Sequence, residues 1–199
     1  MNVGAVISGG MNSWFAAYSA VSKGYDLTCM IAASRHPILG IQSKAAQLPL
    51  ISSDTLQGAI EIAKEKYGIS GVVFGVINST FKKEKIEDIC KKAGVDCITP
   101  IWHISDDLFL HQLMKNFHVI ISGISAQGLK KEHLGLRVGL TFPDRMASLN
   151  ISPSGEDGKF DTIVLDCPLF QRKIVIEKSE ARMENECKGT LNITRATLV

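Results

Sequence analysis

Short apolar runs alternate with amphipathic runs through the first two-thirds of this chain. Residues 3–7, 27–33 and 72–74 are almost entirely apolar and are bounded by polar or glycine-containing segments, which predicts buried strands. Residues 96–98 begin a further strand, and residues 117–121 form another. Helix-like segments separate these runs. Strands that are apolar on both faces indicate a parallel sheet covered by helices on both sides.

Helix boundaries are predicted from capping residues and from glycines. The hydroxyl and carboxylate oxygens of residues 52–54 are N-cap candidates for a helix that Gly68 ends. Gly94 ends a second helix, predicted over residues 81–92, and Ser105 caps a third. These helices give the chain the βα repeat of an α/β fold.

The local composition of the sequence changes at about Leu134, where glycines and prolines become frequent. Strand-like runs follow at residues 160–165, 173–177 and 190–195. We therefore expect an α/β domain over residues 1–133 and a small β-rich C-terminal lobe over residues 134–199.

Composition narrows the classes of function. The 199 residues are 45% hydrophobic and 21% charged, and a net charge of +2 with interspersed signs argues against a nucleic-acid footprint. No apolar run is long enough to span a membrane, and a strand at the very start leaves no room for a signal peptide. Five cysteines without a C-x-x-C pair favour reduced core thiols, so we expect a cytoplasmic protein.

A glycine-containing hexapeptide, Ser8-Gly9-Gly10-Met11-Asn12-Ser13, separates the first predicted strand from an amphipathic segment over residues 14–23. Unpaired backbone N–H groups and the helix dipole would make this turn an anion cradle, and glycines let a phosphate approach closely. The spacing differs from both the dinucleotide fingerprint and the Walker pattern. A plain tight turn, with serines that cap the helix, is the alternative interpretation.

Ligands of parallel α/β sheets bind beyond the carboxyl ends of the strands. The loops after Ile7, Ala33, Phe74 and Ile121 are therefore predicted to form the functional edge.

The hexapeptide resembles the S-G-G-x-D-S loop of the PP-loop ATP pyrophosphatases. A second, distant signature over residues 151–170 is similar to the N-P-x-G-E-x-G-E-[YF]-x-T…D-x-P-[LI]-F segment of the diphthine–ammonia ligases, which carry a PP-loop at the N-terminus. Residues 71–77, 100–102, 125–129 and 134–135 resemble the middle of that family. The resemblance extends from about residue 2 to residue 177.

The resemblance implies an adenine nucleotide alpha hydrolase-like (HUP, Rossmann-like) core and an ATP-dependent, AMP-forming carbon–nitrogen ligase. Members of the family adenylate the carboxylate of diphthine on translation elongation factor 2, and ammonia then displaces AMP to complete diphthamide. The implied partners are ATP, ammonia and elongation factor 2, with no direct contact to nucleic acid or membrane. A homodimer is left open.

The family pattern also assigns roles to individual residues. Nucleotide binding falls to Ser8, Gly9, Gly10, Asn12, Ser13, His36, Gly75, Lys83 and Lys85. Asn12 takes the metal position, and Glu156 and Asp161 are the carboxylates expected to meet ammonia, metal or substrate.

Several positions depart from the family pattern. Met11 and Asn12 stand where Lys and Asp are usual, and Lys159 replaces the second Glu of the G-E-x-G-E motif. Asn12 keeps a neutral oxygen but loses the charge, and one unit charge at about 4 Å is worth roughly 4 kcal/mol at an effective dielectric near 20. Binding of Mg²⁺ is therefore expected to weaken.

Other functions stay open beside the ligase. The chain could be a catalytically weak paralogue that binds ATP or AMP without turning it over, or a structural paralogue whose cradle is filled by Met11. A different PP-loop chemistry, such as tRNA modification, is disfavoured because the sequence shows no thiol pair for sulfur transfer and no basic patch. Nucleotide binding without AMP formation would identify the weak paralogue.

Overall fold

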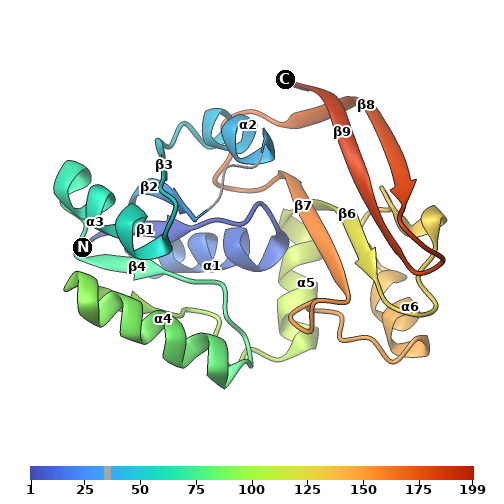
Figure 1. The fold of residues 1–199 in the computed structure, drawn as a ribbon, viewed down its shortest axis with the longest axis horizontal. Coiled ribbons are helices and arrows are strands. Elements are labelled where there is room, and N and C mark those ends of the chain that lie inside the picture. Colours follow the sequence, from blue (N-terminus) through green and yellow to red (C-terminus); the bar gives the residue numbers. More distant parts are fainter. Residues whose placement is uncertain (34–36) are drawn as a thin grey trace. The chain divides into compact units, whose positions relative to one another are not determined.

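The computed structural model describes residues 1–33 and 37–199 and divides into two compact units, Met1–His103 and Ile104–Val199. His36 lies outside the described residues. The division predicted between residues 133 and 134 falls inside the second unit, because a strand that precedes it pairs with strands that follow it. Each unit is built on its own sheet (Figure 1).

The first unit contains a parallel sheet whose described strands are ordered β3-β2-β1-β4-β5. The strands are β1 (Asn2–Val6), β2 (Asp26–Ala32), β3 (Leu50–Ser52), β4 (Gly71–Val73) and β5 (Asp96–Ile98). The helices between them are α1 (Met11–Ser22), α2 (Pro37–Ala46), α3 (Leu56–Tyr67) and α4 (Thr80–Ala93). This arrangement confirms the predicted parallel α/β core.

Alternating side chains of the central strands bury both faces of the sheet. Ile31 of β2 and Val72 of β4 pack into a core cluster with residues of α3 and α4. The intervening residues Met30 and Val73 are also buried, and they face the other side because strand side chains alternate. Helix α1 contacts β1, β2 and β4.

The predicted helix stops are confirmed, and one predicted cap is wrong. Gly68 and Gly94 end α3 and α4 in the left-handed region, with φ of 61° and 63°, where glycine has no Cβ penalty. Ser105 caps the next helix as predicted. Helix α3 is capped by Thr55, whose hydroxyl accepts from the N–H of Gly58 at 3.1 Å, and not by residues 52–54. Those residues end β3 and lead into the turn.

The order of the strands creates a topological switch point between β1 and β4. From β1 the chain moves outward through β2 to β3 and then returns past β1 to β4 and β5. Neighbouring loops therefore leave the sheet in opposite directions beyond the carboxyl ends of β1 and β4. A crevice at such a point is where ligands bind in open α/β sheets.

The second unit consists of short helices and an antiparallel sheet in the order β7-β6-β9-β8. Its strands are β6 (His118–Ser125), β7 (Phe160–Asp166), β8 (Ile174–Met183) and β9 (Lys188–Leu198). Its helices are α5 (Asp106–Asn116), η1 (Lys131–His133) and α6 (Phe142–Ser148). The predicted β-rich C-terminal region is confirmed, whereas η1 and α6 were not predicted.

The placement of residues 117–121 in the parallel sheet is wrong. They fall largely in β6, which pairs antiparallel with β7 and β9. An apolar run indicates burial on both faces but not the direction of the neighbouring strand, so the sequence pattern could not separate the two sheets. The loop after Ile121 is thus not part of the parallel sheet edge.

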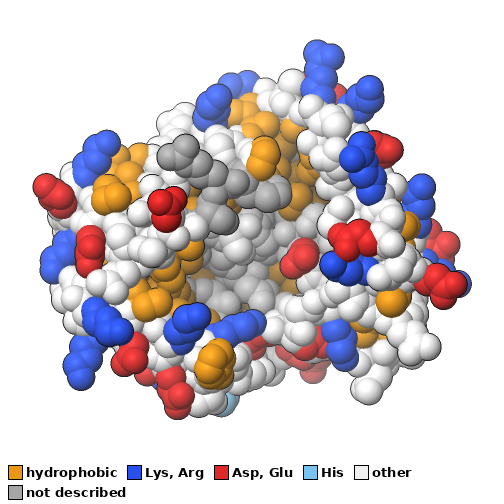
Figure 2. Space-filling view, in the orientation of Figure 1, with side chains coloured by type: hydrophobic (Ala, Val, Ile, Leu, Met, Phe, Trp, Pro, Cys, Tyr) orange, Lys and Arg blue, Asp and Glu red, His pale blue; other side chains and the backbone are white. Residues whose placement is uncertain are grey.

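Within residues 1–33 and 37–199, none of the helices has both the length and the apolar character needed to cross a membrane. Acidic and basic side chains are intermingled over the face shown in Figure 2.

Candidate functional site

The turn between β1 and α1 leads from the sheet edge into the N-terminus of the helix. Ile7 still belongs to the sheet edge, because its N–H donates to the carbonyl of Ile31 at 2.9 Å. Gly9 then takes a φ of +95°, a backbone conformation that side chains rarely adopt. Gly10 is the N-cap residue, and no side-chain hydrogen bond caps the helix. A helix N-terminus of this kind carries the positive end of the helix dipole, so this end of α1 is a candidate anion site.

The N-termini of helices α3, α4 and α5 differ from that of α1. A side-chain hydroxyl caps each of these three helices, from Thr55, Ser79 and Ser105 respectively. Helix α1 instead begins at Gly10, without a side-chain cap, directly after the glycine turn at the switch point.

Ser13 shapes the turn from inside. Its hydroxyl donates to the carbonyl of Gly10 at 2.9 Å and accepts from the N–H of Ser8 at 3.3 Å. The Ser13 side chain is buried, whereas Ser8 is exposed. The Ser8 hydroxyl donates to Ser13 Oγ at 3.3 Å, so both serines take part in the hydrogen bonds of the turn, and their contact with a nucleotide stays a prediction.

Gly75, in the loop after β4, lies directly against the first turn of α1. A Cβ atom on Gly75 would lie 2.5 Å from the carbonyl oxygen of Asn12 and 2.7 Å from the nitrogen of Ser13. Only glycine permits this approach. The structure thereby brings together three of the predicted nucleotide-binding residues at the switch point.

A buried amide, which the sequence analysis missed, holds the turn from α2. Gln42 has no exposed surface; its Nε2 donates to the carbonyl of Gly9 at 3.0 Å, and its Oε1 accepts from Trp14 Nε1 at 3.0 Å. A buried amide must satisfy its donors and acceptors, so this network fixes the orientation of the Gly9 peptide. The only sequence signal was a glutamine on the apolar face of a short helix.

Asn12 carries an unsatisfied buried atom. Its Oδ1 is inaccessible to solvent and has no hydrogen-bond partner among the described residues. An orphaned acceptor in this position fits either a cation or a ligand donor. Within the described part of the chain, no three His, Cys, Asp or Glu side chains gather into a metal site. A metal here would therefore take one neutral oxygen from Asn12 and its other ligands from elsewhere.

Two of the predicted nucleotide-binding lysines lie on α4. The Nζ of Lys83 is 2.9 Å from a carboxylate oxygen of Glu87 and 5.1 Å from the ring centroid of Trp102. Lys83 is thus engaged on its own helix and on the aromatic ring. Lys85 is exposed on the same helix. Trp102 packs against the core cluster of the first unit.

In the second unit, Glu156 lies in a turn between two glycines with positive φ, Gly155 at 66° and Gly158 at 73°. Its negative charge is close enough to Asp106, at the start of α5, to affect the pKa of that carboxyl group. Burial raises the pKa of Asp106, and the charges of Asp107 and Glu156 raise it further. A carboxyl group with a perturbed pKa beside another carboxylate is a recurrent feature of functional sites. Asp106 was not predicted, because next to Ser105 it reads as an ordinary first-turn acid.

Asp161 is placed by a glycine on the neighbouring strand. It pairs with Gly123 across β6 and β7. A Cβ atom on Gly123 would lie 2.7 Å from Asp161 Oδ2 and 3.1 Å from its Cβ. The absent side chain at position 123 is what lets the exposed carboxylate lie over β6.

Lys159 closes the turn that carries Glu156. Its Nζ lies 3.4 Å from Asp157 Oδ2 and donates to the carbonyl of Asn150 at 3.1 Å. The reversed charge at position 159 is thus accompanied by an acidic partner within the same turn, and it has a structural role there.

Comparison with known proteins agrees with this division of the chain. Residues 105–199 match the family model described as the diphthamide synthase C-terminal domain, which begins one residue after the start of the second unit. The diphthine–ammonia ligase of Rattus norvegicus is 26% identical, over 91% of this chain and 85% of its own length. That of Homo sapiens is 24% identical, over 90% and 84%.

A solved structure, described as a predicted subunit of tRNA methyltransferase from Methanocaldococcus jannaschii, aligns with a TM-score of 0.48 and 16% identity. It covers 84% of this chain and 98% of that chain. The sequence comparisons extend over both units: the chain is similar to the diphthine–ammonia ligases, and its second unit matches the model of the diphthamide synthase C-terminal domain.

Proposed function

We propose that this protein is an ATP-dependent, AMP-forming amide ligase of the diphthine–ammonia ligase type, acting in the cytoplasm on elongation factor 2. The observation that carries the proposal is the glycine turn at the N-terminus of α1, at the switch point, against which Gly75 closes the loop after β4. The similarity to diphthine–ammonia ligases over both units supports the same reaction.

The cradle suits the departure of pyrophosphate from ATP. A carboxylate is a poor electrophile, and adenylation converts its oxygen into part of a good leaving group. Negative charge develops on the pyrophosphate as it leaves, and the first-turn N–H groups of α1 would stabilise it. Gln42 contributes by holding the Gly9 peptide, so that the turn is organised before the nucleotide arrives.

Mg²⁺ would neutralise phosphate charge when bound with the nucleotide. In this chain the residue proposed to contact it is Asn12, through the buried Oδ1 that lacks a partner among described residues. A neutral amide attracts a cation less than a carboxylate does. We therefore propose that the metal is held chiefly by the phosphates and bound weakly by the protein.

Carboxylates of the second unit are proposed to act on the ammonia side of the reaction. Ammonium must lose a proton to become a nucleophile, and Glu156 or Asp161 can accept it. Asp106, whose pKa is raised partly by the charge of Glu156, is a further proton acceptor in that neighbourhood.

A second function is a nucleotide-binding relative with little or no ligase activity. Two observations favour it: the neutral Asn12 in the cradle and the engagement of Lys159 with Asp157. This version keeps the binding of ATP or AMP and loses the release of AMP.

Calorimetric titration with ATP and Mg²⁺ tests the proposal, with the Met11→Lys/Asn12→Asp double variant measured in parallel. Micromolar binding by the wild type, followed by AMP release in the presence of ammonia and diphthine-bearing elongation factor 2, is the expected result. Binding without AMP release supports the second function. Absence of binding by both proteins contradicts both proposals.

A further inference from the structure

Two thiols of the first unit lie in one side-chain cluster where α4 meets β5. Cys90 is 1% exposed, in the last turns of α4, and belongs to the core cluster. Cys97 of β5 is half-buried and packs against the same cluster. The backbone connects them tightly, because the N–H of Val95 donates to the carbonyl of Cys90 at 3.1 Å.

One face of α4 supplies the surroundings of this pair. Lys83, Glu87 and Cys90 are spaced by four and three residues and so lie on the same side of the helix. Lys83 bonds to Glu87 and lies over the ring of Trp102. This face therefore covers the end of β5 and the segment that follows it.

The cluster stabilises a thiolate at one of its two sulfurs. A hydrogen bond between the two thiols lowers the pKa of Cys97, and the charge of Lys83 lowers it further, against the effects of burial and Glu87. The same hydrogen bond and burial raise the pKa of Cys90. Of the two thiols, Cys97 is therefore the one that loses its proton more readily, with the buried Cys90 as its hydrogen-bond donor.

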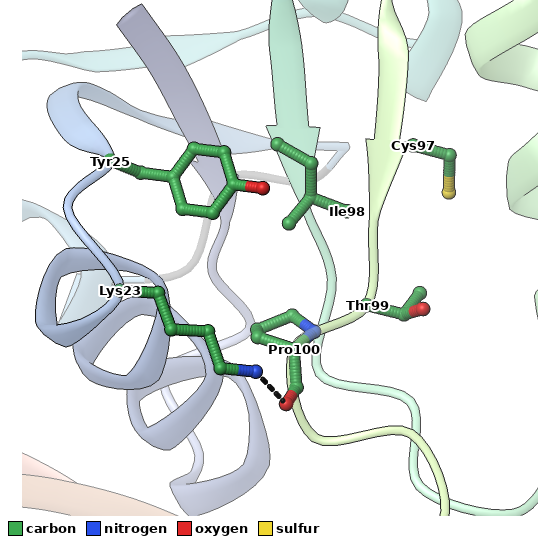
Figure 3. Close-up of a pocket in the computed structure, with 6 residues that line it drawn as sticks. All are labelled: Lys23, Tyr25, Cys97, Ile98, Thr99 and Pro100. Carbon is green, nitrogen blue, oxygen red and sulfur yellow. Dashed lines mark hydrogen bonds between the residues drawn. The ribbon is translucent and has the colours of Figure 1, made fainter. Parts of the chain in front are cut away.

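Cys97 is also the more accessible thiol of this pair, because it is half-buried whereas Cys90 is 1% exposed. A cavity of about 280 Å³ lies beside its strand, lined by Lys23, Tyr25 and residues 97–100. Figure 3 shows Cys97 and Ile98 leaving β5 on opposite sides, with Ile98 turned toward Tyr25 and the Cys97 sulfur turned away from it. Lys23 spans the cavity edge, where its Nζ donates to the carbonyl of Pro100 at 3.0 Å.

We propose that Cys97 is a reactive thiol that small hydroperoxides oxidise, and that Cys90 is its resolving partner. The Cys97 thiolate attacks one oxygen of hydrogen peroxide, the O–O bond breaks, and hydroxide leaves and is protonated to water. Cys97 is then a sulfenic acid.

The second step closes the pair. The Cys90 thiol loses its proton as its sulfur attacks that of Cys97, the S–O bond breaks, and the hydroxyl leaves with that proton as water. Two thiols are oxidised to one disulfide, and one peroxide is reduced to two waters. The product covalently joins the end of α4 to β5. This chemistry is independent of the proposed ligase function.

Peptide mapping of the full chain tests the proposal. The protein is treated with stoichiometric hydrogen peroxide, its remaining thiols are blocked with N-ethylmaleimide, and it is digested with trypsin without reduction. Cleavage after Lys91 and Lys92 separates the two cysteines into peptides 86–91 and 93–115. The expected product is these two peptides joined by a disulfide. Recovery of both with blocked thiols, while Cys187 is oxidised, overturns the proposal.

Matched variants separate the chemistry from simple exposure. Cys187 is half-buried in the second unit and serves as an internal reference for alkylation by iodoacetamide. We expect the pH midpoint of Cys97 alkylation to lie below that of Cys187. Cys90→Ala should raise the Cys97 midpoint, and Cys90→Ser, which keeps a hydroxyl donor, should restore it. Equal midpoints for Cys97 and Cys187 in the wild type contradict the assignment of Cys97 as the reactive thiol.

Discussion

Gln42 donates from its side-chain amide to the carbonyl oxygen of Gly9, 3.0 Å away, and so ties helix α2 to the glycine turn. The same side chain accepts from the indole of Trp14. Three segments, the turn, α1 and α2, are thus joined through one buried residue. The conformation of the turn is set by this network as well as by its glycines.

Replacing Gln42 by Leu should destabilise the protein. The change removes the acceptor of a buried indole N–H and the donor to the Gly9 carbonyl, and each lost partner costs about 1–3 kcal/mol. Urea unfolding followed by circular dichroism measures the loss. Gln57→Leu is the control, because the Gln57 side chain bonds to Glu61 at the surface of α3, and its effect should stay within about 0.5 kcal/mol. Equal effects of the two changes would contradict a role for the buried network.

Gly75→Ala should also destabilise the first unit. The new Cβ would meet the backbone of Asn12 and Ser13 at 2.5–2.7 Å, and overpacking of this kind typically costs about 1–3 kcal/mol. Gly40→Ala is a matched control, because Gly40 is an exposed helical glycine with open space around its Cβ position. That change should leave stability unchanged or raise it by up to about 1 kcal/mol. A tolerated alanine at position 75 would show that the two loops need not approach closely.

Asn12→Asp should make nucleotide binding depend more strongly on Mg²⁺. The variant places a charge where Asn12 Oδ1 is now buried and unpaired among described residues. Affinity for ATP should rise by about tenfold or more with Mg²⁺, equivalent to about 1.4 kcal/mol, and should not rise in EDTA. Calorimetry in the two buffers measures this. Asn116→Asp, an exposed change at the end of α5, controls for net charge. A gain that is equal in both buffers would argue against a metal at Asn12.

Gly123→Ala tests the position of the Asp161 carboxylate without removing it. The added methyl group would displace Oδ2, which lies 2.7 Å from the Cβ position. We expect AMP release to fall as far as it does in Asp161→Asn while the melting temperature changes little. An active Gly123→Ala protein beside an inactive Asp161→Asn protein would show that the carboxylate is needed but its position is not.

Asp106→Asn should change how stability depends on pH. Because the folded-state pKa of Asp106 is raised, the folded protein binds its proton more readily than the unfolded chain does. Asp106 therefore costs stability above the raised pKa, and this cost disappears as the pH falls through the raised value toward the unfolded pKa of about 3.9. The stability of the wild type relative to the variant should thus increase on acidification. Unfolding at a series of pH values measures the difference, and a difference that does not change with pH would contradict the raised pKa of Asp106.

The sequence predicted much of the first unit because its central strands are short apolar runs and because α3 and α4 each end at a glycine. Gly68 and Gly94 act at their own positions, so neighbouring residues are enough to identify them. The direction of a strand relative to its neighbours, by contrast, cannot be predicted from local residues. The apolar run in β6 looks the same whether its partners are parallel or antiparallel, and β7 and β9 are distant in sequence.

The candidate site was predictable where residue type dictates conformation and was missed where partners are remote. Glycines 9, 10 and 75 indicate turns and places where two backbone segments approach closely. Gln42 gives no such signal, because its partner Gly9 is 33 residues away. Asp106 is similar: its interaction with Glu156 arises only from the fold of the second unit.

Trp14 is bonded to the same glutamine that holds the glycine turn, and this gives the protein an internal optical probe. The chain has two tryptophans, so Trp102→Phe leaves Trp14 as the sole indole emitter. Its emission depends on the hydrogen bond from Nε1 to Gln42, and Gln42 in turn bonds the Gly9 carbonyl. A ligand that reorients the Gly9 peptide should therefore shift the Trp14 fluorescence of this variant. The kinetics of ligand binding at the glycine turn can then be followed without an added dye.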